Sequence, residues 1–449
     1  MAQAVALSRR LRDLVTRPAT GSGPARNLLV VVRADPIICG HSTEARNLAE
    51  AARQAGFEKV HLLTYPIEQL RDSGLPLKPM DSVRPYSEGI HVDRPTPIGD
   101  YKVLDGRLLY AISGHLVDLL HQCRGRTLVM GLYLVPHGEI VMNAVQSFWH
   151  SGRPLDVMTI AEAVGSDITN VVSNALRDGK FGSAQFVLTN FLMHDKPVAV
   201  SEFTKDLIVE SGKQVDEVLG TNFAERLALR CGVSYPAIDT SEYVGLAEKR
   251  DEVDAVLAKR GLERDGYLLY LSRLVPAKGV DDLIVAYKAS TLHGKKPLVI
   301  CGTGPAKESL HELAGGDPSI RFFHDVGDAE KGPLMHGCLS YVFPSKPRPE
   351  FVETFGIAVV EKMLAGGRGP VITTETGGIP EASGGHALIH PAGDVEALRA
   401  RLDELAGMSS EQRLALAGKA QGYALRFDRA EVLRKLAEAT EGEPAEAMG

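Results

Sequence analysis

The stretch YVFPSKPRPEFVETFGIAVVEKMLAGGRGPVITT, residues 341–374, contains the alternation that decides the fold. It begins with YVFPS, an apolar run typical of a buried strand, followed by the loop KPRPE. IAVVEKMLA then predicts a short helix that ends at Gly366 and Gly367, and PVITT predicts a second strand. A strand, a helix and a strand in this order join parallel strands, so the stretch predicts an α/β fold.

The same alternation extends over the rest of the second half. Apolar, strand-like runs recur there, most of them separated by helical segments, which is typical of a doubly wound α/β domain. The further runs are YLLYLSRL (267–274), PLVICG (297–302), RFFHDV (321–326) and ALIHPA (387–392).

The first half repeats the pattern less regularly. Strands are predicted at NLLVVVR (27–33), KVHLLTYP (59–66) and TLVMGLYLVPHG (127–138). TEARNLAEAARQAGF predicts a helix with Ser42 as its N-cap. Residues 67–105 are rich in Pro, Gly and charge and predict a long excursion from the sheet.

A chain of 449 residues is too long for one ordinary core, and the pattern breaks near residue 240. We therefore expect two Rossmann-like, doubly wound domains facing across a cleft. The expected divisions are a lead-in at 1–24, an N-terminal domain at 25–240, a C-terminal domain at 241–425 and a C-terminal helix at 426–449 that packs toward the first domain.

Composition excludes several classes of function. A net charge of −7 argues against a nucleic-acid partner, and no apolar run is long enough to span a bilayer. The N-terminus lacks the apolar core of a signal peptide. Five scattered cysteines form no C-x-x-C, so neither a zinc site nor a disulfide framework is expected and a cytoplasmic location is the default. The oligomeric state is left open.

Ligands of a doubly wound sheet bind beyond the carboxyl ends of its strands, where several polar residues fall. Arg273 and Lys278 follow one strand and can neutralise a diphosphate, although lysine and arginine are more often plain surface charges. Gly302, Thr303 and Gly304 form a lone G-x-G, with Lys307 in place of the third glycine of a dinucleotide fingerprint. That break disfavours an NAD-dependent oxidoreductase and favours a tight turn that lets a ligand approach the backbone.

Two glutamates flank the start of the helix in the opening stretch. Glu353 precedes the turn at Phe355 and Gly356, and Glu361 lies on the helix about 12 Å further along at ~1.5 Å per residue. That separation is awkward for the carboxylate pair of a glycosidase. The two side chains suit two hydroxyl-bearing parts of one extended ligand instead, unless both simply face solvent.

Taken together, SRLVPAKGV, CGTGP, E-T-F-G-I-x-x-x-E and TGGIPE resemble the retaining glycosyltransferases of family four, which have the GT-B fold. The resemblance covers about residues 265–395 and continues more weakly into the first half. It implies that the domain at 25–240 binds the acceptor and that the domain at 241–425 binds the nucleotide sugar. It implies that Arg273 and Lys278 hold the diphosphate of a nucleotide sugar and that Glu353 binds the hydroxyls of the transferred sugar. The remaining donor contacts implied are Glu361 on the ribose, backbone at Phe355, Gly356, Ile357 and Val326, the Gly302–Thr303 turn, and the glycine loop at Gly40.

The first half departs from the family pattern in two places. Gly40 is followed by His41 where the family often has a second glycine. Where a family strand often supplies a histidine to the sugar, this chain has Ala161 and Glu162, and His137 is the remaining histidine at a strand end. His41, His137 and Glu162 are therefore the expected residues on the acceptor and sugar side, although His137 can equally be structural.

The implied activity is retaining sugar transfer from a GDP- or UDP-linked donor to a small polar acceptor, plausibly in antibiotic-type metabolism. The chain has no D-x-D, so neither a metal nor another cofactor is expected. The alternatives are a thiol acceptor as in lincosamide-type pathways, a GT-B epimerase or phosphorylase, and a non-catalytic nucleotide-sugar binder.

Overall fold

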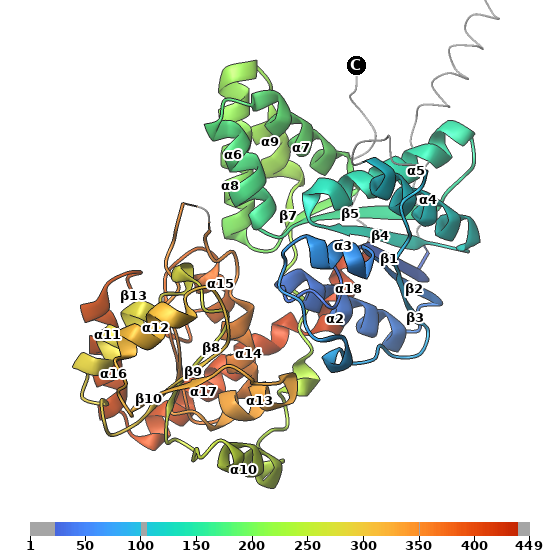
Figure 1. Cartoon of the computed structure of the whole chain (residues 1–449). Coiled ribbons are helices and arrows are strands. Elements are labelled where there is room, and N and C mark those ends of the chain that lie inside the picture. The colour runs from blue at the N-terminus through green and yellow to red at the C-terminus, as the bar shows by residue number, and fades with distance from the viewer. Residues whose placement is uncertain (1–22, 100–105, 350, 439–449) are drawn as a thin grey trace, which may run out of the picture. The chain divides into compact units, whose positions relative to one another are not determined.

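The structure is a computed structural model that describes residues 23–99, 106–349 and 351–438. The predicted lead-in falls, except for its last two residues, outside this part of the chain. The described chain divides into two compact units (Figure 1). Unit 1 contains residues 23–200, 205–237 and 429–438, and unit 2 contains residues 201–204 and 238–428.

Unit 1 is built on a seven-stranded sheet in the order β3-β2-β1-β4-β5-β6-β7, and its neighbouring strands run parallel. The order reverses between β1 and β4, which is the switch point of a doubly wound sheet. The strands are β1 (Asn27–Val31), β2 (Lys59–Leu63), β3 (Ile90–Asp93), β4 (Thr127–Leu132), β5 (Val157–Ala163), β6 (Lys196–Ala199) and β7 (Gly232–Val233).

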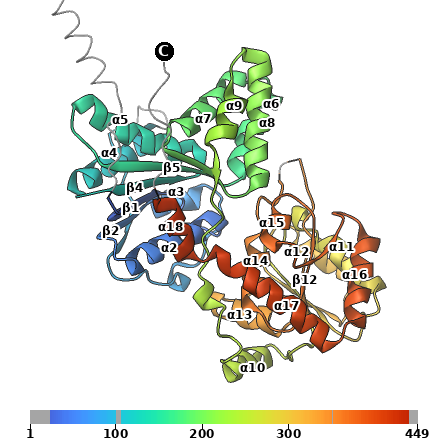
Figure 2. The same ribbon diagram turned by 180° about the vertical axis from the view of Figure 1, so that it is seen from behind.

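Helices cover both faces of this sheet. One core joins the strands to α2 and to the C-terminal helix α18, which packs on α2 (Figure 2). A second core lies under α4 and α5, and a third joins β5 and β6 to α6, α7, α8 and α9. The helices are α2 (Gly40–Gln54), α3 (Ile67–Asp72), α4 (Gly106–Gln122), α5 (Glu139–Ser151), α6 (Ser173–Arg177), α7 (Phe181–Met193), α8 (Glu202–Leu219), α9 (Phe223–Arg230) and α18 (Arg429–Ala437), with short turns η1 (Met80–Ser82), η2 (Leu134–Gly138) and η3 (Asp167–Val172).

Unit 2 is built on a six-stranded parallel sheet in the order β10-β9-β8-β11-β12-β13. The order reverses between β8 and β11, so the loops after these two strands flank the switch point. The strands are β8 (Leu268–Leu271), β9 (Leu298–Cys301), β10 (Ile320–Phe323), β11 (Ser340–Phe343), β12 (Val371–Thr374) and β13 (Leu388–His390).

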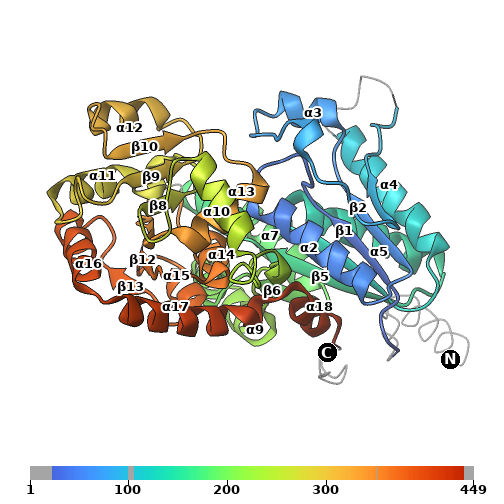
Figure 3. The same ribbon diagram turned by 90° about the horizontal axis from the view of Figure 1, so that it is seen from below.

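Two sets of helices enclose the sheet of unit 2. Figure 3 shows α11, α12 and α16 on one side of the strands and α13 and α14 on the other. The helices are α10 (Arg250–Lys259), α11 (Val280–Ala289), α12 (Lys307–Ala314), α13 (Asp328–Gly337), α14 (Ile357–Ala365), α15 (Ile379–Ser383), α16 (Val395–Gly407) and α17 (Ser410–Ala424), with turns η4 (Thr240–Glu242), η5 (Pro276–Lys278) and η6 (Leu425–Phe427).

Two local predictions for unit 1 were wrong. Helix α2 begins at Gly40 with Cys39 as its N-cap, so Ser42 is buried inside the first turn and does not cap the helix. Residues 67–99 are not one continuous excursion from the sheet, because β3 (Ile90–Asp93) within this range pairs with β2 and forms the edge of the sheet. A short, half-buried edge strand between prolines gives a weak sequence signal.

None of the helices in the described parts of the chain has both the length and the apolar character needed to cross a membrane.

Candidate active site

Lys278 and Glu353 meet at the switch point of unit 2. Lys278 ends η5 after β8, is 5% exposed, and its ammonium forms an ion pair with the Glu353 carboxylate after β11. The Lys278 ammonium also lies over the rings of Phe343 at 4.8 Å and Phe351 at 5.1 Å. The structure thus joins two of the predicted catalytic residues in a largely buried, charged contact.

Glycines directly beside these residues make the close packing possible. Gly279 has φ +67°, and a Cβ there would lie 1.9 Å from the carbonyl oxygen of Pro344. Gly377 has φ +59°, and its Cβ would lie 2.0 Å from the carbonyl oxygen of Glu353, which also accepts a hydrogen bond of 3.0 Å from the Gly378 amide. The glycines of AKGV and TGGIPE therefore let separate backbone segments approach the ion pair.

The N-terminus of α14 presents polar backbone next to Glu353. Gly356 is its N-cap with φ 101°, and within the described chain the amides of Gly356 and Ile357 donate no hydrogen bond. Phe355 is 2% exposed and packs edge-on against Phe427 at 5.1 Å. Amides without a hydrogen-bond partner, at the positive end of the helix dipole, favour an anion or a hydroxyl oxygen.

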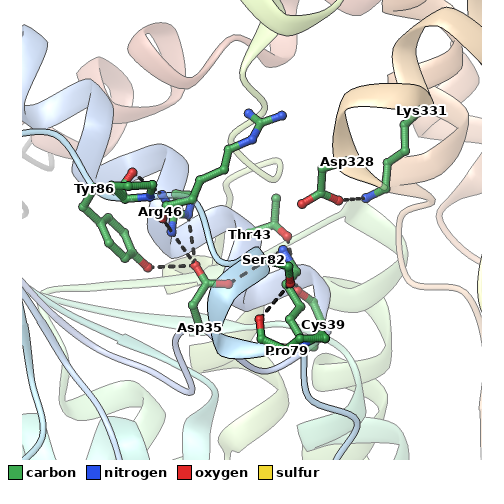
Figure 4. Close-up of polar contacts among 12 residues, drawn as sticks. Asp35, Cys39, Thr43, Arg46, Pro79, Ser82, Tyr86, Asp328 and Lys331 are labelled. Carbon is green, nitrogen blue, oxygen red and sulfur yellow. Dashed lines mark hydrogen bonds and ion pairs between the residues drawn. The ribbon is translucent and has the colours of Figure 1, made fainter. Parts of the chain in front are cut away.

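Glu361 lies one turn further along α14. The residues around it, Tyr243 and Lys331, were not predicted from the sequence. Its carboxyl hydrogen bonds with Tyr243 and is near Lys331, which pairs with Asp328 at 2.8 Å (Figure 4). Burial raises the pKa of Glu361, while Lys331 and the Tyr243 hydroxyl oppose the rise. Tyr243 lies where the sequence pattern breaks near residue 240, and Lys331 carries no local motif.

Arg273 and Val326 lie on separate loops of the same sheet edge. Arg273 is exposed, its carbonyl oxygen accepts a 2.8 Å hydrogen bond from the Tyr270 hydroxyl, and its guanidinium forms no ion pair with any described residue. Val326 is half-buried between β10 and α13.

The Gly302–Thr303 turn is pressed against the loop that follows β8. Gly302 has φ +132°, and a Cβ there would lie 2.0 Å from the carbonyl oxygen of Ser272. The Thr303 carbonyl oxygen accepts a 2.8 Å hydrogen bond from the Leu274 amide. The close approach that Gly302 permits is therefore made by the backbone at Ser272, where the sequence predicted the approach of a ligand.

In unit 1, His41 and His137 lie near the ends of β1 and β4, with exposed Gly40 at the start of α2. The Nε2 of His41 is 3.2 Å from a guanidinium nitrogen of Arg33. His137 is 1% exposed, donates from Nδ1 to the Leu132 carbonyl oxygen, and its Nε2 is 3.1 Å from the Tyr65 hydroxyl. Burial lowers the pKa of His137 to about 4, so it is neutral and accepts from Tyr65.

Glu162, at the end of β5, is fully buried beside Glu44 and Asp167. No N–H donor reaches either carboxyl oxygen of Glu162 within the described residues, so a hydrogen bond with Glu44 requires a proton on one of the two carboxyls. Burial raises the pKa of Glu162 well above its ordinary value and that of Glu44 to about 7. Asp167, whose pKa burial raises to about 6, accepts hydrogen bonds from four amides.

Comparison with known sequences finds similarity in the second half of the chain. Residues 253–421 match the family model described as "Glycosyl transferases group 1". The O-antigen chain mannosyltransferase B of Escherichia coli is 28% identical over 153 residues, which are 33% of this chain and 38% of that protein. The aligned part thus spans well under half of this curated relative.

Comparison with solved structures covers nearly the whole chain. Anabaena HepE in complex with UDP and glucose has a TM-score of 0.63 at 16% identity, over 92% of this chain and 98% of that one. Sucrose-phosphate synthase from Thermosynechococcus elongatus has a TM-score of 0.63 at 17% identity, over 92% and 97%. The likeness and the two parallel sheets confirm the predicted fold: this chain has the GT-B fold, and its residues 253–421 match the glycosyl transferases group 1 model.

Proposed function

We propose that this chain is a retaining glycosyltransferase that moves a sugar from a nucleoside-diphosphate donor to a small polar acceptor without a metal ion. The family match over residues 253–421 supports the reaction class. A relative named a mannosyltransferase and a similar structure solved with UDP-glucose support a GDP- or UDP-linked sugar as the donor.

The observation that carries this proposal is the ion pair of Lys278 and Glu353 at the switch point of unit 2. A departing diphosphate gains negative charge, and a cation held in a dry site stabilises that charge more than it would in water. The amides at the start of α14 and the exposed Arg273 add donors for the same group. Glu353 orients the lysine and can accept from hydroxyls of the sugar.

The proposed reaction breaks the bond between the anomeric carbon and the diphosphate oxygen. The acceptor oxygen bonds to the same face of that carbon, and its proton passes to the departing phosphate oxygen. No separate general base is required, so the protein's work is positioning and charge stabilisation. Glu361 holds the ribose, and the backbone at Val326 meets the base.

In unit 1, Gly40 is proposed to serve the donor, and His41, His137 and Glu162 are proposed to serve the acceptor and sugar side. Both ring nitrogens of His137 already have partners, so it acts by holding the Tyr65 hydroxyl in place. The proposal places the reaction in antibiotic-type metabolism, with a thiol acceptor as the alternative to an alcohol. An activity screen should therefore test each acceptor both as the alcohol and as the matching thiol.

A thermal-shift screen against UDP, GDP, TDP and ADP tests the donor half. A diphosphate present at ~100 times its Kd should stabilise the protein by about 2.7 kcal/mol, and the nucleotide with the largest shift identifies the base. NMR of the product formed from the matching donor should then show the donor's anomeric configuration retained. No shift with any of the four nucleotides, or an inverted product, would refute the proposal.

A further inference from the structure

Arg33 occupies the switch point of unit 1 and takes no part in the site described for unit 2. It follows β1 by two residues, and Tyr133 follows β4, the strand beyond the reversal in order. The Arg33 guanidinium lies over the Tyr133 ring, 4.9 Å from its centroid. Tyr133 has φ 96°, a conformation that is rare for a side-chain-bearing residue and is concentrated at functional sites.

No carboxylate neutralises Arg33 among the described residues. The acidic residue nearest in sequence, Asp35, is engaged elsewhere, by Arg46 at 2.9 Å, by the Tyr86 hydroxyl at 3.0 Å and by Lys78 at 3.8 Å (Figure 4). The Nε of Arg33 is buried and, within the described chain, has no hydrogen-bond partner. Arg33 is half-buried, and burying its Nε–H without a partner is costly unless a ligand supplies an acceptor.

The groups in direct contact with Arg33 are the His41 and Tyr133 rings. Arg33 donates to the Nε2 of His41 at 3.2 Å, so His41 accepts there as a neutral ring. His137 is neutral and binds the Tyr65 hydroxyl, and Arg33 is close enough to influence the titration of Tyr65, Tyr133 and His137. The end of the sheet thus combines one unpaired cation with aromatic rings and hydroxyls.

We propose that this cluster of Arg33, His41, Tyr65, Tyr133 and His137 binds an acceptor that carries an anionic group, namely a phosphorylated or carboxylated sugar or polyol. Arg33 presents a planar fork of donors that matches phosphate and carboxylate oxygens. The side chains of His41, Tyr65 and Tyr133 suit the faces and hydroxyls of a sugar ring, and buried His137 holds the Tyr65 hydroxyl in place. The inference rests on the proposed transferase function and narrows its acceptor class.

Binding to the full chain can be measured without any donor, by calorimetry with glucose 6-phosphate, glucuronate, glucose and inorganic phosphate. Glucose 6-phosphate or glucuronate should bind at least ten times more tightly than glucose. Comparing the affinities of glucose 6-phosphate and glucuronate shows whether the site prefers a phosphate or a carboxylate. The affinity for inorganic phosphate measures how much of the binding the anion contributes without the sugar. Equal binding of glucose and its charged derivatives, or no binding of either charged sugar at millimolar concentration, would overturn the proposal.

Variants separate an anion contact from a purely structural one. Arg33→Gln should weaken binding of the charged sugar by about 10- to 100-fold, Arg33→Lys should restore part of it, and both should leave glucose binding unchanged. Arg71→Gln removes an exposed cation from α3 of the same unit and should change nothing. If Arg33→Gln weakens glucose and glucose 6-phosphate equally, Arg33 is structural and the proposal fails.

Failure of the donor site in unit 2 and failure of the acceptor site in unit 1 give different results. Loss of nucleotide-diphosphate binding would remove the proposed donor site in unit 2 and leave the result for charged sugars unchanged. Loss of charged-sugar discrimination would remove the acceptor inference and leave the transferase proposal intact.

Discussion

The Lys278 side chain illustrates how much one residue depends on its surroundings. Its ammonium is nearly removed from water, between the Glu353 carboxylate and two phenylalanine rings. A buried ammonium with one carboxylate partner is held in a fixed place, and that preorganisation is what charge stabilisation in a transition state requires.

Replacing Lys278 with Ala should lower kcat by about 100- to 1000-fold, because a donor that stabilises the departing diphosphate is lost. Lys278→Arg should recover part of the rate, since the charge remains. Steady-state kinetics with the donor found in the thermal-shift screen provide the measurement. Lys295→Gln, an exposed site in the same unit, is the matched control. A Lys278→Ala enzyme with normal kcat would contradict the assignment.

Gly377 gives a second test at the level of one residue. A methyl group there would lie 2.0 Å from the Glu353 carbonyl oxygen, so Gly377→Ala must displace the backbone that carries Glu353. We expect a fall in kcat and a loss of stability of roughly 2 kcal/mol or more, the range of backbone-strain substitutions.

Gly385 is a matched control for that substitution. It has φ +76°, but a Cβ there would meet nothing within 4 Å, so Gly385→Ala carries the conformational strain without the collision. Equal effects of the two substitutions on kcat would show that the contact with Glu353 is irrelevant to activity.

At the scale of elements, three buried carboxyls connect α2, β5 and η3. Burial raises the pKa of Glu44 to about 7 and that of Asp167 to about 6, so the folded state holds protons that the unfolded chain has released. Stability from these groups is complete below their ordinary pKa values and is lost as pH rises through their folded values. His137 has a pKa lowered to about 4, so it acts oppositely, costing stability as pH falls below 6.5.

Above about pH 6.5 His137 is neutral in both the folded and the unfolded chain and no longer changes the stability. As pH rises from about 6.5 to 8, unit 1 should therefore lose the stability that the protonated Glu44 and Glu162 carboxyls contribute. Glu162→Gln keeps the shape and removes one charge of the pair, so it should raise Tm at pH 8 by a few degrees (~1 kcal/mol corresponds to several degrees in a small domain) and flatten the pH profile. Thermal melts from pH 5.5 to 8.5 measure both. The exposed Glu217→Gln is the control, and a Glu162→Gln protein less stable than wild type at pH 8 would refute this account.

Sequence patterns predicted the central strands better than the helices that surround them. The runs at 27–33, 267–274 and 370–374 are continuous and apolar because their strands are buried on both faces. Residues 173–193 gave no clear prediction, although α6 and α7 lie there, because their apolar residues pack within a local helical cluster. The loops bearing Lys278 and Glu353 were placed on one sheet edge, but an ion pair across 75 residues depends on strand order, which local sequence does not specify.

In unit 1, the role of Arg33 could not be predicted from the sequence for a different reason. Arg33 closes a predicted strand and looks like an ordinary surface charge in sequence. Its lack of a counter-charge emerges only when Asp35 is seen to be engaged by Arg46 and Lys78. Partner choice among charges is a property of the folded chain.

At the scale of the whole molecule, the chain leaves unit 1 after residue 237, forms unit 2, and returns at residue 429. The returning helix α18 contributes Val432, Leu433 and Leu436 to the core that also contains α2 and the strands of unit 1. Lys196 of β6 reinforces the attachment through the carbonyl oxygens of Lys435 and Leu436. The first unit is thus complete only when the last helix has been synthesised.

This topology predicts that a substitution near the C-terminus weakens the N-terminal unit. Leu433 is 4% exposed in that core, so Leu433→Ala should cost about 2–5 kcal/mol, the range for a buried leucine, whereas exposed Lys435→Ala should stay within about 0.5 kcal/mol. Hydrogen exchange should show faster exchange in α2 and β1, more than 370 residues earlier in the chain, with the strands of unit 2 unchanged, because stability is lost locally in the unit whose core is cut. Faster exchange confined to α18 itself, or spread equally over β8–β13, would mean that the helix does not hold the first unit together.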